Sequence, residues 1–392
     1  MVFEARWGIL ATGGIAATFV KDLLRDAKAR GAEDIKHTVR AVASSSSKER
    51  AEHFINETGI PGPCAAYGSY EELVADPNVD IIYVATPHSH HFQNTMLALE
   101  AGKHVLCEKP FTVNAEQLEV LRDVARQKKL FLMEAVWTRY FPVSVQIRDL
   151  IRRGEIGEVL RVTADNSVGA NPEEDWGDNH RMVNLDLAGG ALLDLGIYSL
   201  TWVFQTLYHT LPVDQRRPPS AISSYVAKYP GTGADEDTTV LLTFPTTTPT
   251  NNFKPNRTSH AVASTSLRLA SNPDRRKTAG PAIRIQGTKG EIQVHGPAYR
   301  PEGFRLIPLV PKGADPNSVE IKEVENPFPD NGHGMYWEAD EAARCLRDGK
   351  LESETMPLEE SIQLMRVMDE VRKQAGLVYP EKIESRSYPL NL

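Results

Sequence analysis

The chain has 392 residues, of which 41% are hydrophobic and 24% are charged, and its formal net charge at pH 7 is -8. This composition is typical of a folded globular protein and excludes a largely disordered chain, while the length favours two domains. Because no run of five or more Lys and Arg residues interrupts the negative charge, we expect no nucleic-acid partner.

The cysteines and the N-terminal sequence indicate the cellular compartment in which the protein is expected. Cys64, Cys107 and Cys345 have neither disulfide nor metal-ligand spacing, which favours free thiols in a reducing compartment. The first ten residues, MVFEARWGIL, do not resemble a signal peptide. We also expect no membrane partner, since no run approaches the ~20 apolar residues that span a bilayer. The expectation is a cytoplasmic protein.

Strands and helices alternate through the first third of the chain. Apolar runs predict strands over residues 6–10, 39–43, 79–85, 104–107 and 130–134, and periodic segments predict helices over 15–26, 48–57, 71–75, 92–101 and 115–127. This alternation predicts a Rossmann domain, 1–138, with a doubly wound parallel sheet. Its ligand crevice is expected at the carboxyl ends of the strands.

From about residue 139 the pattern changes. A helix over 144–153 is followed by strands over 159–166, 221–228, 238–244, 261–269, 282–286 and 291–295, and then by helices over 335–348 and 358–374. This predicts a C-terminal α+β domain, 139–392, with a large open and mostly antiparallel sheet. Whether the last helices pack back on the first domain stays open. Residues 245–257, rich in Thr, Asn and Pro, predict a flexible surface loop.

A glycine-containing turn follows the first strand. The segment Gly8-Ile-Leu-Ala11-Thr-Gly13-Gly14-Ile-Ala16 resembles the dinucleotide fingerprint G-x-G-x-x-G/A, with Ala11 in the first glycine place. A glycine lets the backbone approach the pyrophosphate, and the helix N-terminus supplies amide donors. Ala11 fits if its φ is negative. The predicted cofactor residues here are Ala11, Thr12, Gly13, Gly14 and Ile15; the alternative is an ordinary turn.

The second strand ends in Ser44-Ser45-Ser46-Ser47-Lys48-Glu49-Arg50, without the acid that binds the ribose 2′-hydroxyl of NAD. Hydroxyls and cations suit a 2′-phosphate instead, which predicts NADP rather than NAD. The alternative is a solvated helix cap, and both interpretations are compatible. The candidate contacts are Ser44, Ser45, Ser46, Lys48 and Arg50.

Polar segments also follow the strands 79–85 and 104–107. The first contains three histidines in four residues, but no cysteine or carboxylate lies at metal-ligand spacing, so we expect no metal. We interpret Thr86, Pro87, His88 and His91 as contacts near the nicotinamide ribose, with loop residues of no role as the alternative. The second, Glu108-Lys109-Pro110, places a lysine where it would act as a proton shuttle. Pro110 predicts a fixed bend, for which a cis peptide is one option.

A segment of the second domain also combines glycines with polar groups. Gly189-Gly190 leads into an apolar helix that carries Asp194 and Tyr198, four residues apart and therefore on one face. An acid and a phenol on an apolar face are costly to bury without a use. The alternative is a buried pair whose hydrogen bonds are satisfied.

With Glu134-Ala-Val-Trp137-Thr-Arg139, these segments form an ordered set. At these separations the set resembles the glucose–fructose oxidoreductase/inositol dehydrogenase family (Gfo/Idh/MocA) over nearly the whole chain. Within the family, the resemblance is to the branch of dimeric dihydrodiol dehydrogenases and, most closely, fungal NADP-dependent D-xylose 1-dehydrogenases.

The resemblance implies a role for several residues. Lys109 matches the catalytic lysine, Tyr198 the acid/base, and Asp194 the acid that orients substrate or lysine. Trp137 and Arg139 match a segment near the substrate, and Glu108 lies on the cofactor side. A homodimer through the open faces of the C-terminal sheets is also implied.

The implied reaction is oxidation of D-xylose and related aldoses at C1 to the 1,5-lactone, with NADP⁺ as the hydride acceptor. One alternative is oxidation of trans-1,2-dihydrobenzene-1,2-diols. A second is a non-catalytic NAD(P)-binding regulator, which we would expect to lack the lysine or the phenol.

Overall fold

The computed structural model describes residues 2–245, 258–274, 276 and 278–392, and the chain forms two compact units. Unit 1 comprises the chain up to Tyr140 together with Phe328–Ile362 and Pro380–Leu392. Unit 2 comprises Phe141–Pro327 and Gln363–Tyr379. The C-terminal part is therefore divided between the units and is not one contiguous domain from residue 139. Of the loop expected over 245–257, residues 246–257 lie outside the described residues.

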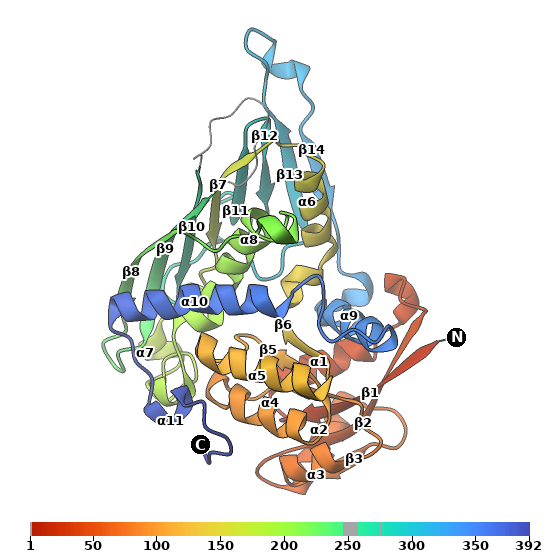
Figure 1. Ribbon diagram of the computed structural model, residues 1–392. Coiled ribbons are helices and arrows are strands. Elements are labelled where there is room, and N and C mark those ends of the chain that lie inside the picture. Colours follow the sequence, from red (N-terminus) through yellow and green to blue (C-terminus); the bar gives the residue numbers. More distant parts are fainter. Residues whose placement is uncertain (1, 246–257, 275, 277) are drawn as a thin grey trace. The chain divides into compact units, whose positions relative to one another are not determined.

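Unit 1 contains sheet A, a six-stranded sheet with the order β3-β2-β1-β4-β5-β6 (Figure 1). Every neighbouring pair in it is parallel, as the sequence predicts. The strands are β1 (Phe3–Leu10), β2 (Ile35–Ala43), β3 (Ala65–Tyr67), β4 (Ile81–Val84), β5 (His104–Glu108) and β6 (Leu132–Ala135). The helices are α1 (Gly14–Leu23), α2 (Lys48–Thr58), α3 (Tyr70–Ala75), α4 (His91–Glu100), α5 (Ala115–Lys128), α9 (Met335–Arg347) and α11 (Glu381–Glu384).

The strand order of sheet A reverses direction between β1 and β4. In doubly wound sheets this switch point, at the carboxyl ends of the strands, is where dinucleotides bind. The central strands are buried on both faces, and β4 is buried along its whole length. This explains their continuous apolar runs, because a parallel sheet is covered on both sides.

Two C-terminal segments complete unit 1. Helix α9 packs against α1 and β1, and its first turn is held by the Asp22 carboxylate of α1. That carboxylate accepts hydrogen bonds from the backbone N–H groups of His333, Gly334 and Met335 at 2.8–2.9 Å. The chain end, from residue 380, is held by amide side chains: Gln117 donates to the carbonyls of residues 383 and 385, and Gln93 bonds residues 387 and 390.

Unit 2 contains sheet B, an eight-stranded sheet with the order β14-β13-β12-β11-β7-β10-β9-β8. All neighbours are antiparallel except β7 and β10, which are parallel. Its strands are β7 (Val159–Asp165), β8 (Ala221–Lys228), β9 (Asp235–Pro245), β10 (Thr258–Ser266), β11 (Ile283–Gly287), β12 (Gly290–Val294), β13 (Gly303–Pro308) and β14 (Lys322–Glu325). The remaining helices are α6 (Pro142–Arg152), α7 (Pro172–Asp175), α8 (Ile197–Leu207) and α10 (Leu358–Ala375), whose first residues belong to unit 1.

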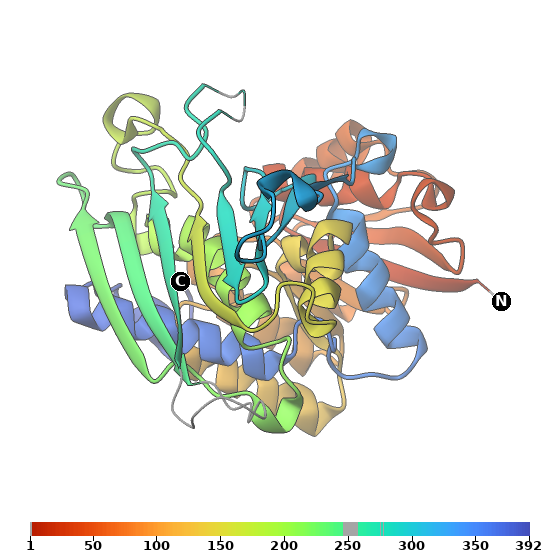
Figure 2. The ribbon, with the colours of Figure 1, turned by 90° about the horizontal axis from the view of Figure 1, so that it is seen from above.

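Among the described residues, helices cover one face of sheet B and leave the other face uncovered. Phe204 of α8 contacts Phe244 of β9, and Gln374 of α10 bonds Ser224 of β8. Ser224 is paired in register with Val240, which lies on the same face as Phe244, so both helices cover one face (Figure 2). The opposite face presents exposed side chains, including Leu241.

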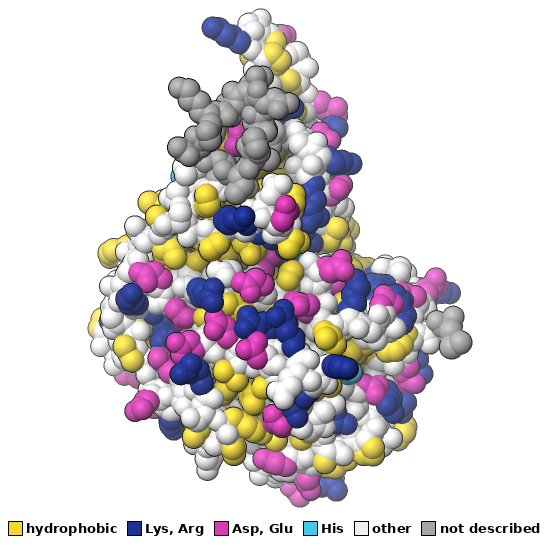
Figure 3. Space-filling view, in the orientation of Figure 1, with side chains coloured by type: hydrophobic (Ala, Val, Ile, Leu, Met, Phe, Trp, Pro, Cys, Tyr) yellow, Lys and Arg dark blue, Asp and Glu magenta, His cyan; other side chains and the backbone are white. Residues whose placement is uncertain are grey.

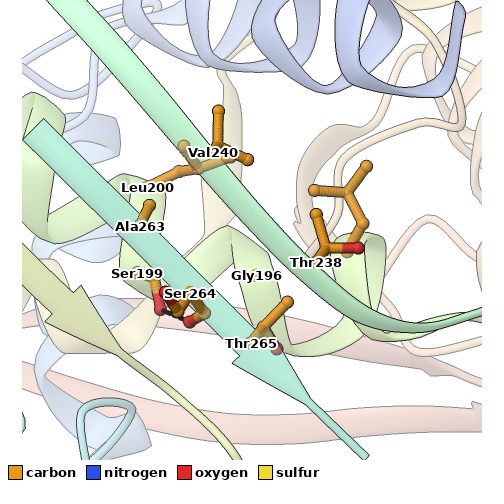
Figure 4. Close-up of a pocket in the computed structure, with 9 residues that line it drawn as sticks. Gly196, Ser199, Leu200, Thr238, Val240, Ala263, Ser264 and Thr265 are labelled. Carbon is orange, nitrogen blue, oxygen red and sulfur yellow. Dashed lines mark hydrogen bonds between the residues drawn. The ribbon is translucent and has the colours of Figure 1, made fainter. Parts of the chain in front are cut away.

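The segment Leu185–Leu207, which contains α8, is long and apolar enough to cross a membrane by length and composition. The expectation that no such segment exists was therefore wrong. However, almost all of it is buried inside the protein, as the core helix of a folded unit would be. A gap between α8 and strands β9 and β10 (Figure 4) has no room for a water molecule, so it is a packing gap and not a ligand site.

On the face shown in Figure 3, acidic and basic side chains are intermingled. Within unit 1, Arg344 and Arg347 both form ion pairs with Asp34. The three cysteines are free, and burial raises the pKa of Cys64 and Cys345 to about 12.

Candidate active site

The first turn of α1 is open to a ligand. Gly13 precedes the helix and no side chain caps it, whereas Ser47, Ser69 and Asn114 cap α2, α3 and α5. A Cβ atom added at Gly13 or Gly14 would meet nothing within 4 Å, and Ile15 is 42% exposed. The first backbone N–H groups of a helix lack intrahelical partners and carry its positive dipole end. The turn therefore fits a pyrophosphate.

Ala11 differs from the expectation. Its φ is +93°, so the condition under which an alanine would fit without strain, a negative φ, is not met. The residue occupies the place of the first glycine, where the chain leaves β1 while the Ala11 N–H still donates to the Ala43 carbonyl at 3.2 Å. An alanine in this region costs on the order of 1–3 kcal/mol, which the surrounding strands must outweigh. Gly8 and Ala16 provide close packing: a Cβ at Gly8 would lie 2.7 Å from Ile82 Cδ1, and Ala16 is fully buried.

The serine segment after β2 divides into two parts. Ser47 caps α2 by accepting a hydrogen bond from the Arg50 N–H at 3.3 Å, and Ser44 is buried with its Oγ 3.0 Å from that of Ser46. The exposed members are Ser45, Ser46, Lys48, Glu49 and Arg50. Hydroxyls and two cations at the end of β2 have the chemistry that a 2′-phosphate requires.

The histidine loop and the Glu-Lys-Pro turn, which the sequence presents as separate motifs, are joined by His91. Its Nδ1 lies 2.7 Å from the Pro110 carbonyl oxygen, and its Nε2 lies 2.9 Å from the Thr86 carbonyl oxygen. Burial lowers the pKa of this fully buried imidazole to about 3, so the ring is neutral and donates to one carbonyl at a time. His88 is also buried, with its ring 5.8 Å from that of His91, while Pro87 is exposed.

Carboxylates hold the Glu-Lys-Pro turn. The Glu108 carboxylate accepts hydrogen bonds from the Tyr83 hydroxyl and, at 3.2 Å, from the Lys109 backbone N–H. Glu134 accepts from the Phe111 N–H at 3.0 Å. The Lys109–Pro110 peptide is cis, one of the options expected for the bend, and the Lys109 side chain is partly exposed. The turn is therefore fixed while its lysine remains accessible.

Arg139 belongs to a buried ion pair. It is fully buried, and its Nη1 donates to Glu360 Oε1 at 2.6 Å while Nη2 donates to the Thr355 carbonyl at 2.5 Å. These contacts attach the segment after β6 to the start of α10. They give Arg139 a structural role, and its contact with substrate stays a prediction. Trp137, two residues earlier, is 8% exposed.

In unit 2, Asp194 and Tyr198 lie on consecutive helical segments. Residues Leu192–Gly196 form a π-helix that runs directly into α8. Such wide turns are rare and occur frequently at functional sites. Arg181 Nη1 donates to Asp194 Oδ1 at 3.2 Å, and the Tyr198 ring centroid lies 5.9 Å from that of Tyr299. Both predicted residues are largely buried, at 5% and 7% exposure.

Asp235 supports this helical segment and was not predicted from the sequence. Its Oδ2 accepts hydrogen bonds from the Leu192 N–H at 2.6 Å and from the Thr238 hydroxyl at 3.2 Å. Gly190 has a φ of +133°, and a Cβ there would lie 2.0 Å from Asp235 Oδ1. A Cβ at Gly189 would lie 2.6 Å from the Arg181 carbonyl oxygen. Glycine is therefore required at both positions, because a side chain there would collide with these oxygen atoms.

Among the described residues, one group of His, Cys, Asp or Glu side chains lies close enough to share a metal ion, namely His295, Glu323 and Glu325. It is on sheet B, and Arg305 already pairs with Glu323 at 2.8 Å. The histidines of residues 88–91 do not belong to it.

Comparisons with known proteins show the family of the chain. Residues 5–136 match the oxidoreductase family with an NAD-binding Rossmann fold, GFO_IDH_MocA, and residues 144–293 match the GFO/IDH/MocA C-terminal domain. The chain is 53% identical to a D-xylose 1-dehydrogenase (NADP(+)) of Hypocrea jecorina, covering 99% of this chain and 97% of that one. It is 36% identical to the trans-1,2-dihydrobenzene-1,2-diol dehydrogenase of Homo sapiens, covering 96% and 98%.

Solved structures share the fold at lower identity. An NAD binding oxidoreductase from Klebsiella pneumoniae is 20% identical, with a TM-score of 0.76 over 95% of this chain and 97% of that one. An aldose-aldose oxidoreductase from Caulobacter crescentus is 21% identical, with a TM-score of 0.71 over 95% and 98%.

Proposed function

The chain belongs to the Gfo/Idh/MocA oxidoreductase family, and from this membership we propose that it is an NADP-dependent dehydrogenase that oxidises D-xylose at C1 to the 1,5-lactone. The observation that carries the proposal is the 53% identity, over 99% of the chain, to a D-xylose 1-dehydrogenase (NADP(+)). The polar residues at the carboxyl ends of β1, β2, β4 and β5 support it, since they fit a dinucleotide with a 2′-phosphate.

The cofactor would be held by unit 1. Residues 11–15 would bind the pyrophosphate through backbone N–H groups, and Ser45, Ser46, Lys48 and Arg50 would bind the 2′-phosphate. His88, His91 and the Glu-Lys-Pro turn would lie on the nicotinamide side. When bound, NADP⁺ supplies the acceptor for the hydride that leaves C1.

In the proposed acid–base step, Tyr198 accepts the proton of the C1 hydroxyl as the C1–H bond breaks. The C1–O bond becomes the lactone carbonyl, and the proton passes from the phenol to solvent. The Lys109 ammonium stabilises the phenolate through its charge, and Asp194 orients the pair. No metal takes part in this scheme.

Two substitutions test these roles. Lys109→Met and Tyr198→Phe are each expected to lower kcat by ~10²–10⁴-fold, the usual contribution of a positioned acid or base. NADP⁺ binding, measured by fluorescence titration, should survive in both. Tyr208→Phe, the same change at the end of the same helix, is the control and should retain activity. Wild-type turnover in the Lys109→Met variant would contradict the assignment.

A second candidate substrate class is favoured by the 36% identity to a trans-1,2-dihydrobenzene-1,2-diol dehydrogenase. Absorbance of the reduced nicotinamide should be followed with D-xylose, other aldoses and the dihydrodiol, each with NADP⁺ and NAD⁺. We expect the highest kcat/KM with D-xylose and NADP⁺. No reduction with xylose at saturating concentration, with turnover of the diol, would replace the first proposal by the second.

We also propose that the enzyme is a cytoplasmic homodimer, formed through the open face of sheet B. The support is the row of exposed side chains on that face, among which Tyr225 and Leu241 are 65% and 48% exposed. Fractionation of cells would test the location.

A further inference from the structure

His91, the first residue of α4, is a fully buried histidine that takes no part in the proposed acid–base step. Its two ring nitrogens lie 2.7 Å from the Pro110 carbonyl oxygen and 2.9 Å from the Thr86 carbonyl oxygen. These carbonyls belong to the loops that follow β5 and β4, which are neighbours in sheet A. Because no part of the ring is exposed, His91 would influence the reaction through the two loops and not by contact with a ligand.

The ring has a single proton for its two carbonyl partners. Burial, together with the nearby His88 and Lys109, lowers the pKa of the His91 ring, so the imidazole is neutral. A neutral imidazole has one N–H group, so one carbonyl receives a hydrogen bond and the other faces a lone pair. The nitrogen that carries the proton is therefore decided by the carbonyl that most needs a donor.

The Pro110 carbonyl depends on His91 more than the Thr86 carbonyl does. Pro110 is buried and has no N–H group, and no other donor in the described part of the chain bonds its carbonyl. Thr86 has a second contact with α4, because Asn94 Nδ2 donates to its hydroxyl oxygen at 3.1 Å. The distance to Pro110 is also the shorter of the two. These observations favour a proton on Nδ1 of the ring.

The backbone of Lys109 lies between two such side-chain contacts. On one side, the Glu108 carboxylate accepts a hydrogen bond from the Lys109 N–H at 3.2 Å. On the other side, His91 bonds the carbonyl of Pro110, the next residue. Loss of the second contact would leave a buried carbonyl without a donor, and the backbone would shift to satisfy it. A displacement of a catalytic group by ~1 Å can lower a rate by ~10²-fold.

We propose that His91 is a positioning residue for Lys109: it donates from Nδ1 to the Pro110 carbonyl and so fixes the backbone from which the lysine side chain projects. The effect on catalysis rests on the proposed function. The position of the proton does not, and it is measured on the protein alone.

Nuclear magnetic resonance of the protein with isotope-labelled histidine tests the position of the proton. The His91 signals are assigned by their absence from the spectrum of His91→Asn or His91→Gln. At neutral pH, Nδ1 is expected to have the nitrogen chemical shift of a protonated nitrogen. An unprotonated Nδ1 would overturn the proposal.

Two substitutions test the positioning. Asparagine places an amide close to the position of Nδ1, and glutamine places one close to the position of Nε2. His91→Asn should therefore keep kcat within about threefold of the wild type, whereas His91→Gln should lower kcat about tenfold with little change in the Kd for NADP⁺. His90→Gln is the matched control, because the His90 ring is half-buried and bonds the Ser89 hydroxyl at 2.8 Å. It should retain the kcat of the wild type.

A double substitution separates positioning from a purely structural role. In a Lys109→Met background, the further change His91→Gln should not lower kcat, since the residue to be positioned is absent. Equal losses in His91→Asn and His91→Gln, or an undiminished effect of His91→Gln in the Lys109→Met background, would overturn the positioning role. A wild type that does not oxidise D-xylose would reject the proposed function but leave the position of the proton as measured.

Discussion

Gly190 and Asp235 are the residues on which the helical segment bearing Asp194 and Tyr198 depends. The Asp235 carboxylate holds the first turn through the Leu192 N–H, and its other oxygen lies where a side chain of residue 190 would have to be. The positive φ of Gly190 adds a second restriction. At this position a methyl group therefore meets both a steric and a conformational penalty.

We predict that Gly190→Ala lowers the free energy of unfolding by about 2–4 kcal/mol, from overpacking and backbone strain together. Gly233→Ala is the matched control, because Gly233 has a φ of +83° but nothing within 4 Å of its Cβ position. It should cost about 1 kcal/mol, the conformational part alone. Urea unfolding measures both, and equal losses would show that the contact with Asp235 is unimportant.

Asp235 also predicts a pH dependence of stability. Burial raises its pKa to about 6 from 3.8, so the folded protein takes up this proton at a higher pH than the unfolded chain does. The carboxyl group therefore adds stability as the pH falls from about 6 to about 4, and it costs stability above that window. In Asp235→Asn this contribution is absent. Across the window, the free energy of unfolding of the wild type should rise relative to the variant by on the order of 2 kcal/mol. A difference in the free energy of unfolding between the two proteins that stays constant from about pH 6 to about pH 4 would contradict the raised pKa of Asp235.

Some site residues could be read from the sequence and others could not. Gly13, Lys109 and the serines after β2 could be predicted, because strand ends and short motifs are visible over a few consecutive residues. Asp235 holds a segment that is far from it in sequence, so no spacing in the sequence reveals it. Ala11 shows that residue type alone does not give φ, since the turn imposes a glycine conformation on an alanine.

At the scale of elements, α9 depends on a cap from another helix. The residue that precedes it, Gly334, has no side chain to cap it, and the Asp22 carboxylate of α1 instead accepts hydrogen bonds from the backbone N–H groups of His333, Gly334 and Met335. Asp22 is 1% exposed, so water cannot replace it. The helix is thus fixed to α1 by hydrogen bonds as well as by apolar packing.

We predict that Asp22→Ala lowers the free energy of unfolding by about 2–4 kcal/mol, because two buried donors and one part-buried donor lose a charged acceptor. Asp26→Ala removes a cap that accepts one exposed N–H, that of Lys28, and should cost under about 1 kcal/mol. Chemical denaturation measures the free energy of unfolding of both variants. Similar losses in the two variants would contradict the prediction.

The elements that the sequence missed are short or exposed. β3 has three residues, and β14, with the sequence KEVE, is almost wholly exposed, so neither has an apolar pattern to detect. β13 does alternate, but it lies between Pro-rich turns and was not predicted. β8, whose side chains alternate between exposed and half-buried, was predicted with its exact bounds, and the other predicted strands of sheet B were found with bounds shifted by one to three residues.

At the scale of the whole molecule, the open face of sheet B is the surface on which assembly depends in our proposal. Tyr225 and Leu241 lie on neighbouring strands near one edge of that face, with Leu241 paired in register to Ser223. Toward the other edge the face becomes charged, and Arg284 pairs with Glu291. A face with an apolar part and a charged part is typical of an interface between copies.

We predict that Leu241→Glu weakens dimerisation at least ~100-fold, as expected when a central apolar contact is replaced by a buried charge. Light scattering after gel filtration should then give the mass of a monomer. Val213→Glu, at a residue 77% exposed on a 3-10 turn outside the sheet, should leave the mass unchanged. A dimeric Leu241→Glu variant would place the interface elsewhere.

The division of the chain between the units has a consequence for biosynthesis. Residues up to 140 leave the ribosome long before α9 and the final residues, which complete the same unit. Domains usually fold one after another as they are synthesised, but here the first cannot close its hydrophobic surface until residues 328–362 and 380–392 have also been made. The nascent chain must therefore carry an unfinished nucleotide-binding half past the ribosome, exposed to chaperones or to aggregation, while the second half is being made.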